Sequence, residues 1–124
     1  GGAGYVGCVL TRRLLDAGVK VAGSSDFPCA GMDPLDGIRA AISRRTCRGH
    51  VHEADQRIGL QEALAMYTRT AAEVSGCLDS CGTLETGKRA DFVVLQSPLA
   101  DIDTARVRTT VIGGGVVFGE LGDD

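Results

Sequence analysis

The first part of the chain carries a helical pattern of apolar residues followed by an extended one. Apolar side chains recur on one helical face between residues 5 and 16, which predicts a helix that ends near Gly18. The apolar run at residues 19–23 predicts a short buried strand. The polar residues 24–28 leave this strand as a loop. Proteins of the α/β class place their chemistry at such a junction between strand and loop.

Two further helices are predicted beyond this junction. The first runs from residue 34 to about residue 45, because Asp33 is a typical N-cap and a proline follows it at the first helical position. Residues 46–59 are polar and lack a period, so they predict a loop. Apolar residues three or four positions apart predict the second helix from residue 60 to about residue 74, with a break near Thr70.

The pattern changes to β beyond Gly76. Residues 91–95 and 106–112 are rich in β-branched and apolar side chains, and residues 116–118 continue the pattern after three consecutive glycines. The glycines predict a hairpin between the last two strands. We therefore expect a separate small β unit in this part of the chain.

Composition narrows the class of protein. The 124 residues are 44% hydrophobic and 23% charged, with no tryptophan and few aromatic residues, which predicts one soluble domain with an aliphatic core. A net charge of -3 without a clustered basic face speaks against nucleic-acid binding. No apolar run approaches the roughly 20 residues of a membrane span, and no signal peptide is evident. The five cysteines are irregularly spaced, so we expect reduced thiols and a cytoplasmic protein.

A glycine motif opens the chain. Gly1, Gly4 and Gly7 precede the first predicted helix, and Asp26 follows the next predicted strand. This order resembles the NAD-binding fingerprint of nucleotide-sugar epimerases, in which glycines admit a pyrophosphate and the acid binds a ribose hydroxyl. The sequence includes no strand before Gly1 and no Tyr-x-x-x-Lys pair. The favoured interpretation is a glycine-rich loop before a helix, and an NAD-binding module remains the alternative.

Two groups of cysteine and histidine residues are weaker candidates for sites. Cys47, His50 and His52 bring three metal-ligand types within six residues, although a solvated polar loop is the favoured interpretation. Cys77 and Cys81 are one residue too far apart for the C-x-x-C redox motif, so we expect two structural or surface thiols.

Asp26 is the main candidate for chemistry. A carboxylate at the carboxyl end of a barrel strand can bind a divalent cation and accept a proton from water, although a single aspartate in a loop more often caps a turn. Its segment, LDAGVKVAGSSDFP at residues 15–28, resembles the eighth-strand segment of the amidohydrolase superfamily, in the branch that includes N-substituted formamide deformylases. Three later segments resemble the same family in the same order: QRIGLQEALAMYT at 56–68, GTLETGKRADFVVL at 82–95 and TTVIGGGVV at 109–117.

The resemblance implies both fold and activity. It implies an α/β fold in which residues 1–75 form the end of a (β/α)8 barrel, with the eighth strand at about 19–23 and flanking helices, and residues 76–124 form part of a small β domain. It implies a metal-dependent hydrolase that acts on amide or other non-peptide C–N bonds of a small-molecule substrate. Zinc is the expected divalent metal, and Asp26 is the expected metal ligand and proton relay.

The sequence also departs from that family. Family members carry a His-x-His pair, a mid-barrel Lys or Glu ligand and two further histidines before the eighth strand, and none of these precedes Asp26. The segment before Leu14 departs as well. We therefore expect the isolated chain to be inactive and to form a homo-oligomer or associate with the missing barrel. A non-catalytic α/β fragment that oligomerises remains a further alternative.

Overall fold

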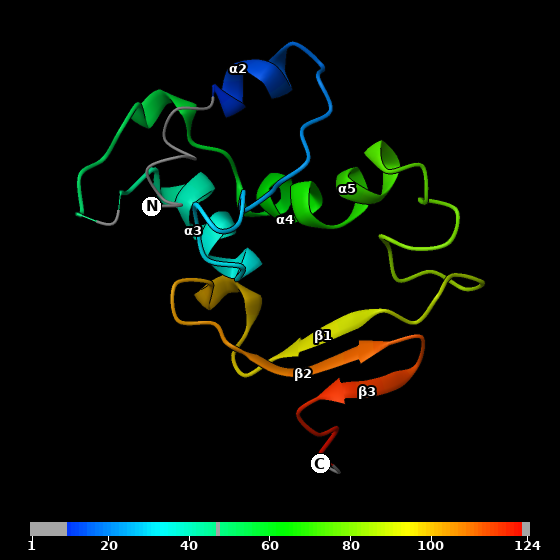
Figure 1. Cartoon of the computed structure of the whole chain (residues 1–124). Coiled ribbons are helices and arrows are strands. Elements are labelled where there is room, and N and C mark those ends of the chain that lie inside the picture. Colours follow the sequence, from blue (N-terminus) through cyan, green and yellow to red (C-terminus); the bar gives the residue numbers. More distant parts are fainter. Residues whose placement is uncertain (1–9, 47, 123–124) are drawn as a thin grey trace.

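The computed structural model, which describes residues 10–46 and 48–122, gathers the helices at one end of the molecule and a three-stranded sheet at the other (Figure 1). The helices are α2 (Thr11–Asp16), α3 (Pro34–Ser43), α4 (Leu60–Tyr67) and α5 (Arg69–Val74), with the short 3₁₀ helices η1 (Ala54–Gln56) and η2 (Leu99–Asp101). The strands are β1 (Phe92–Leu95), β2 (Val107–Ile112) and β3 (Gly115–Phe118). Among the described helices, none has the length and apolarity that a membrane span requires.

Helix α3 begins where the sequence predicts. The Asp33 side chain accepts a hydrogen bond of 2.9 Å from the Leu35 amide and so caps the helix. The helix ends at Ser43, slightly before the predicted residue 45, because Arg44 turns into the left-handed region with φ 56°. The Arg44 amide still bonds to the Ala40 carbonyl at 2.8 Å, which closes the last turn.

The predicted break in the second helix is confirmed at Thr68, between α4 and α5. Thr68 has a non-helical backbone, with φ -127° and ψ -99°. Its hydroxyl donates to the Leu64 carbonyl at 2.8 Å, which satisfies an acceptor at the end of α4. The two helices therefore pack as separate short segments (Figure 1).

The prediction of a strand at residues 19–23 is wrong for this chain, because no part of that segment forms a strand. Its ends form hydrogen bonds to helices instead: the Val19 amide donates to the Leu14 carbonyl at 2.9 Å, and the Gly23 amide donates to the Met66 carbonyl at 2.8 Å. A strand needs a neighbouring strand to satisfy its backbone groups, and none lies beside this segment in the described part of the chain. The first helix is confirmed only from Thr11, since residues 1–9 lie outside the described residues.

The strands predicted beyond Gly76 are confirmed, and they form an antiparallel sheet with strand order β1-β2-β3. The predicted hairpin joins β2 to β3 through Gly113 and Gly114, whose φ angles of 58° and 82° suit glycine in a tight turn. Asp91 fixes this turn, because its carboxylate accepts a hydrogen bond of 2.8 Å from the Gly113 amide.

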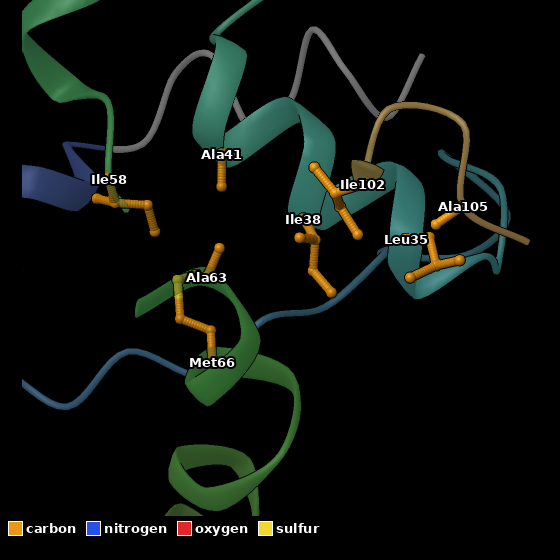
Figure 2. Close-up of a cluster of buried hydrophobic side chains, with 8 residues drawn as sticks. All are labelled: Leu35, Ile38, Ala41, Ile58, Ala63, Met66, Ile102 and Ala105. Carbon is orange, nitrogen blue, oxygen red and sulfur yellow. The ribbon is translucent and has the colours of Figure 1, made fainter. Parts of the chain in front are cut away.

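The core is aliphatic, as the composition predicts. Ala41 of α3 faces Ala63 of α4, and Ile102 and Ala105 approach Leu35 from the segment between η2 and β2 (Figure 2). The core therefore joins two helices to a loop of the β unit. Its buried members are Leu35, Ile38, Ala41, Ile58, Ala63, Met66, Ile102 and Ala105.

Candidate functional site

Asp26 lies at the surface in the loop between α2 and α3. Its backbone makes the local turn: the Cys29 amide donates to the Asp26 carbonyl at 2.8 Å, and the Asp26 amide donates to the Ser24 hydroxyl at 3.3 Å. Its φ of 50° lies in the left-handed region, which aspartate tolerates better than most residues. The carboxylate itself has no hydrogen-bond partner among the described residues, so it does not cap this turn.

The residues before Asp26 line a pocket of about 480 Å³. Ser24 and Ser25 contribute to it from the loop, α3 contributes Gly37 and Arg39, and α4 contributes Tyr67. The pocket is therefore built from the same junction that the sequence singles out. Asp26 follows Ser25 directly but is not among the lining residues.

Tyr67 is a pocket residue that the sequence alone does not reveal. Its ring lies so close to Gly23 and Gly37 that a Cβ atom on either glycine would fall 2.5 Å or less from the tyrosine. Burial raises the pKa of the Tyr67 hydroxyl above its ordinary value, so Tyr67 is a neutral wall of the pocket at physiological pH. The available signal is Gly37, since a glycine inside a predicted helix costs stability and calls for a packing reason.

The charged residues around the pocket form hydrogen bonds and ion pairs that stabilise the fold. The Arg39 guanidinium donates to the Ile102 carbonyl at 2.8 Å and to the Ala105 carbonyl at 2.5 Å, which ties α3 to the segment before β2. Arg39 also pairs with Asp36 at 2.8 Å. These contacts position the pocket wall, whereas the exposed Asp26 carboxylate in the loop before α3 has no partner among the described residues.

The described residues do not form a metal centre by themselves. No group of three or more histidine, cysteine, aspartate or glutamate side chains in the described ranges is arranged to hold a metal ion. His50 and His52 lie exposed in the loop before η1, and Cys47 lies outside the described residues. This loop is held by Arg44, whose buried side chain donates to the His52 carbonyl at 3.3 Å and pairs with Glu53 at 3.2 Å.

Gly1, Gly4 and Gly7 lie outside the described residues, so NAD binding remains a prediction from the sequence.

The charged residues of the GKRAD sequence around β1 have structural contacts. Lys88 donates to the Thr83 hydroxyl at 2.7 Å and pairs with Glu85 at 3.1 Å. Arg89 forms an ion pair with Asp91. The pKa of the Asp91 carboxyl is lowered by Arg89 and by the Gly113 amide, so Asp91 stays ionised while it holds the hairpin turn. This segment stabilises the sheet.

Comparison with known proteins covers nearly the whole chain. Residues 7–118 match the amidohydrolase family. The chain is 39% identical over 97 residues to the N-substituted formamide deformylase of Arthrobacter pascens, across 78% of this chain and 18% of that protein. It is 28% identical over 114 residues to the imidazolonepropionase of Bdellovibrio bacteriovorus, across 89% of this chain and 25% of that protein.

A solved structure agrees with these sequence matches. The crystal structure of an amidohydrolase from Thermotoga maritima MSB8 resembles this chain with a TM-score of 0.64 and 27% sequence identity, across 87% of this chain and 25% of that one. The chain thus spans a quarter or less of the relatives that it matches. Because the match extends through the Asp26 loop, the helices and the sheet, this chain belongs to the amidohydrolase family.

Proposed function

We propose that this chain is the C-terminal part of a hydrolase that acts on amide or other non-peptide C–N bonds of a small molecule. The observation that carries the proposal is the family match over residues 7–118, which contains every described helix and strand in one continuous span. The names of two relatives, a formamide deformylase and an imidazolonepropionase, support a C–N bond as the target.

In this proposal, residues 19–23 are the last strand of the barrel in the complete enzyme. The segment has the sequence pattern of a strand, but no neighbouring strand lies beside it in the described part of the chain. Pairing with the rest of the barrel would satisfy its backbone groups and place Asp26 at the carboxyl end of the strand, where barrel enzymes carry out their chemistry.

Asp26 is the residue to which we assign the chemistry. Its exposed carboxylate has no hydrogen-bond partner among the described residues, and the preceding Ser25 lines the pocket, so in the complete enzyme Asp26 can accept a proton from the water that attacks a substrate carbonyl. A divalent metal such as zinc normally requires three or more protein ligands, and the described residues do not provide such a set. Asp26 supplies at most one ligand, and the isolated chain should therefore show no hydrolase activity.

The assignment is tested in a chimera in which this chain replaces the matching C-terminal segment of the Arthrobacter formamide deformylase. We expect the chimera to hydrolyse N-substituted formamides and Asp26→Asn to lower kcat by ~100-fold or more, since a general base contributes at least that factor. The matched control is Asp103→Asn, an exposed aspartate in the β unit, which should retain full activity. A folded chimera with equal activity in the two variants would contradict the role of Asp26.

A further inference from the structure

Cys77 and Cys81 lie at the two ends of one isolated helical turn, between α5 and the sheet. The Cys77 carbonyl accepts hydrogen bonds of 3.0 Å from the amides of both Ser80 and Cys81, which defines the turn. Both cysteines are half-buried free thiols. Gly76 precedes the turn and Gly82 follows it, with φ angles of 72° and 92°. These left-handed residues separate the turn from any longer helix.

The turn brings the two sulfur atoms together. The Cys81 thiol lies 3.3 Å from the Cys77 sulfur and 3.4 Å from the Cys77 carbonyl oxygen. A disulfide has an S–S bond of about 2.05 Å, so the sulfur atoms must approach by about 1.3 Å from their separation of 3.3 Å. Residues one helical turn apart have Cβ atoms about 5–6 Å apart, whereas a disulfide requires about 3.5–4.5 Å, so closure requires the turn to tighten by about 1–2 Å. Gly76 and Gly82 at its two ends give the backbone the freedom for such an adjustment.

The turn also connects the helices to the sheet. The Ser80 carbonyl accepts a hydrogen bond of 2.9 Å from the Arg89 amide, and Arg89 pairs with Asp91, the residue that holds the β2–β3 turn. At the other end, the Cys77 thiol donates to the Ala72 carbonyl of α5 at 3.5 Å. A covalent bond between the two sulfur atoms would therefore restrain the turn through which the helices connect to the sheet.

We propose that Cys77 and Cys81 form a thiol modification site that closes to an intramolecular disulfide when it meets a small disulfide such as glutathione disulfide. One thiol loses its proton, and its thiolate attacks glutathione disulfide, which forms a mixed disulfide and releases one glutathione. The second thiolate attacks the protein sulfur of the mixed disulfide and expels the second glutathione. The two cysteines together lose two electrons and two protons, and one glutathione disulfide is reduced to two glutathione molecules.

The wild-type chain allows a direct test, because trypsin releases both cysteines in one peptide, residues 70–88. After treatment with glutathione disulfide and blocking of free thiols, we expect this peptide to be lighter than its reduced form by two hydrogen atoms and to carry no block. Dithiothreitol should restore both thiols. A peptide that stays reduced while Cys29 acquires glutathione, that carries two glutathione adducts, or that links two chains would overturn the proposal.

Cysteine variants test whether the proximity of Cys77 and Cys81, and not the general reactivity of thiols, causes the disulfide to form. In a chain whose Cys8, Cys29 and Cys47 are replaced by serine, only the pair remains, and closure should still be complete. The Cys81→Ser variant of the natural chain should keep a stable glutathione adduct on Cys77, because no nearby thiol can displace it. Rapid loss of that adduct without external thiol would show that another cysteine resolves it and would contradict the pairing. This experiment reports on the thiols alone, so its outcome is independent of hydrolase activity.

Discussion

The helical part of the chain and the small sheet bury their apolar side chains to very different extents. In the helices, Ile38 and Ala63 are 3% and 0% exposed and belong to a closed cluster (Figure 2). In the sheet, Val93 pairs with Thr110, and Thr110 pairs with Phe118, so these three share one face. Val93 and Phe118 on that face are 52% and 59% exposed.

The opposite face of the sheet is better covered. Val111 and Thr109 are buried there, and the Thr109 hydroxyl donates to the Glu120 carbonyl at 2.5 Å. The sheet therefore has one face packed within the chain and one apolar face open, whereas the helices bury their apolar side chains in a core that Ile102 and Ala105 help to close. The comparison shows that contacts inside this chain determine the helical packing, while they leave half of the sheet surface uncovered.

The largest expected effect tests this contrast directly. Ile38→Ala removes a buried side chain from the helical core and should destabilise the chain by about 2–5 kcal/mol. Val117→Ala, on the exposed strand β3, should change stability by less than about 0.5 kcal/mol. Urea denaturation followed by circular dichroism measures both. Equal losses in the two variants would mean that the sheet contributes as much buried packing as the helices.

The second prediction distinguishes two reasons for glycine. Gly37→Ala places a Cβ atom 1.9 Å from the Tyr67 hydroxyl oxygen and should cost about 1–3 kcal/mol, despite the better helix propensity of alanine. Gly113→Ala meets no atom within 4 Å but requires a left-handed residue with φ 58°, which costs about 1 kcal/mol.

A double-mutant cycle checks the cause. In a Tyr67→Ala background, the Gly37→Ala penalty should disappear or change sign, because the clash is removed and the helix propensity remains. The Gly113→Ala penalty should be unchanged in that background. If Gly37→Ala stays equally destabilising without the tyrosine ring, packing against Tyr67 is not the reason for the glycine.

The sequence predicts local features of the fold well and long-range ones poorly. The start of α3, the break at Thr68 and the β2–β3 hairpin follow from caps, periodicity and glycines, which act between near neighbours in sequence. The segment 19–23 has the pattern of a strand, but a strand forms only beside another strand. The residues of the segment itself do not show whether such a neighbouring strand is present.

The candidate site shows the same limit. The sequence selects Asp26 as a candidate from its position after an apolar run and from family resemblance, and in the structure Asp26 is an exposed residue that directly follows the pocket residue Ser25. The contact of Tyr67 with Gly23 and Gly37 joins three distant positions, so periodicity cannot reveal it. The hydrogen bonds from Arg39 to backbone carbonyls cannot be predicted from the sequence either, because every residue has a backbone carbonyl and the residue type does not show which one is the acceptor.

The third prediction concerns the cap of α3, a local feature of the helical part. Asp33→Ala removes the acceptor of the Leu35 amide and should destabilise the chain by about 1 kcal/mol. Asp33→Asn should retain nearly all of the stability, because asparagine caps a helix as well as aspartate does. Thermal unfolding of the two variants provides the measurement, and equal destabilisation would show that the charge matters and the cap does not.

The smallest expected effect is a pH dependence of the contact between α2 and α4. The pKa of the Glu62 carboxyl is lowered from its ordinary value of 4.5 by the Gly59 amide, which donates to it at 2.8 Å, and by Arg12, which contacts both carboxylate oxygens at 2.7 and 2.9 Å. Since the folded-state pKa lies below the unfolded one, the contribution is complete above pH 4.5 and is lost as the pH falls through the lowered pKa.

Glu62→Gln should therefore lower stability at pH 7, and its effect should shrink as the pH falls through the lowered pKa of the natural carboxyl, which then loses its charge as well. Because the Gly59 amide is the larger cause of the lowered pKa, Arg12→Gln should remove only part of the pH dependence that Glu62→Gln removes. Added salt should weaken the Arg12 share, which lies near the surface, and should leave the Gly59 share largely intact. Denaturation midpoints of the three proteins at pH 3, 5 and 7 measure these differences. If Arg12→Gln removed as much of the pH dependence as Glu62→Gln does, the pH dependence would come from the ion pair with Arg12 and not from the Gly59 amide at the helix N-terminus.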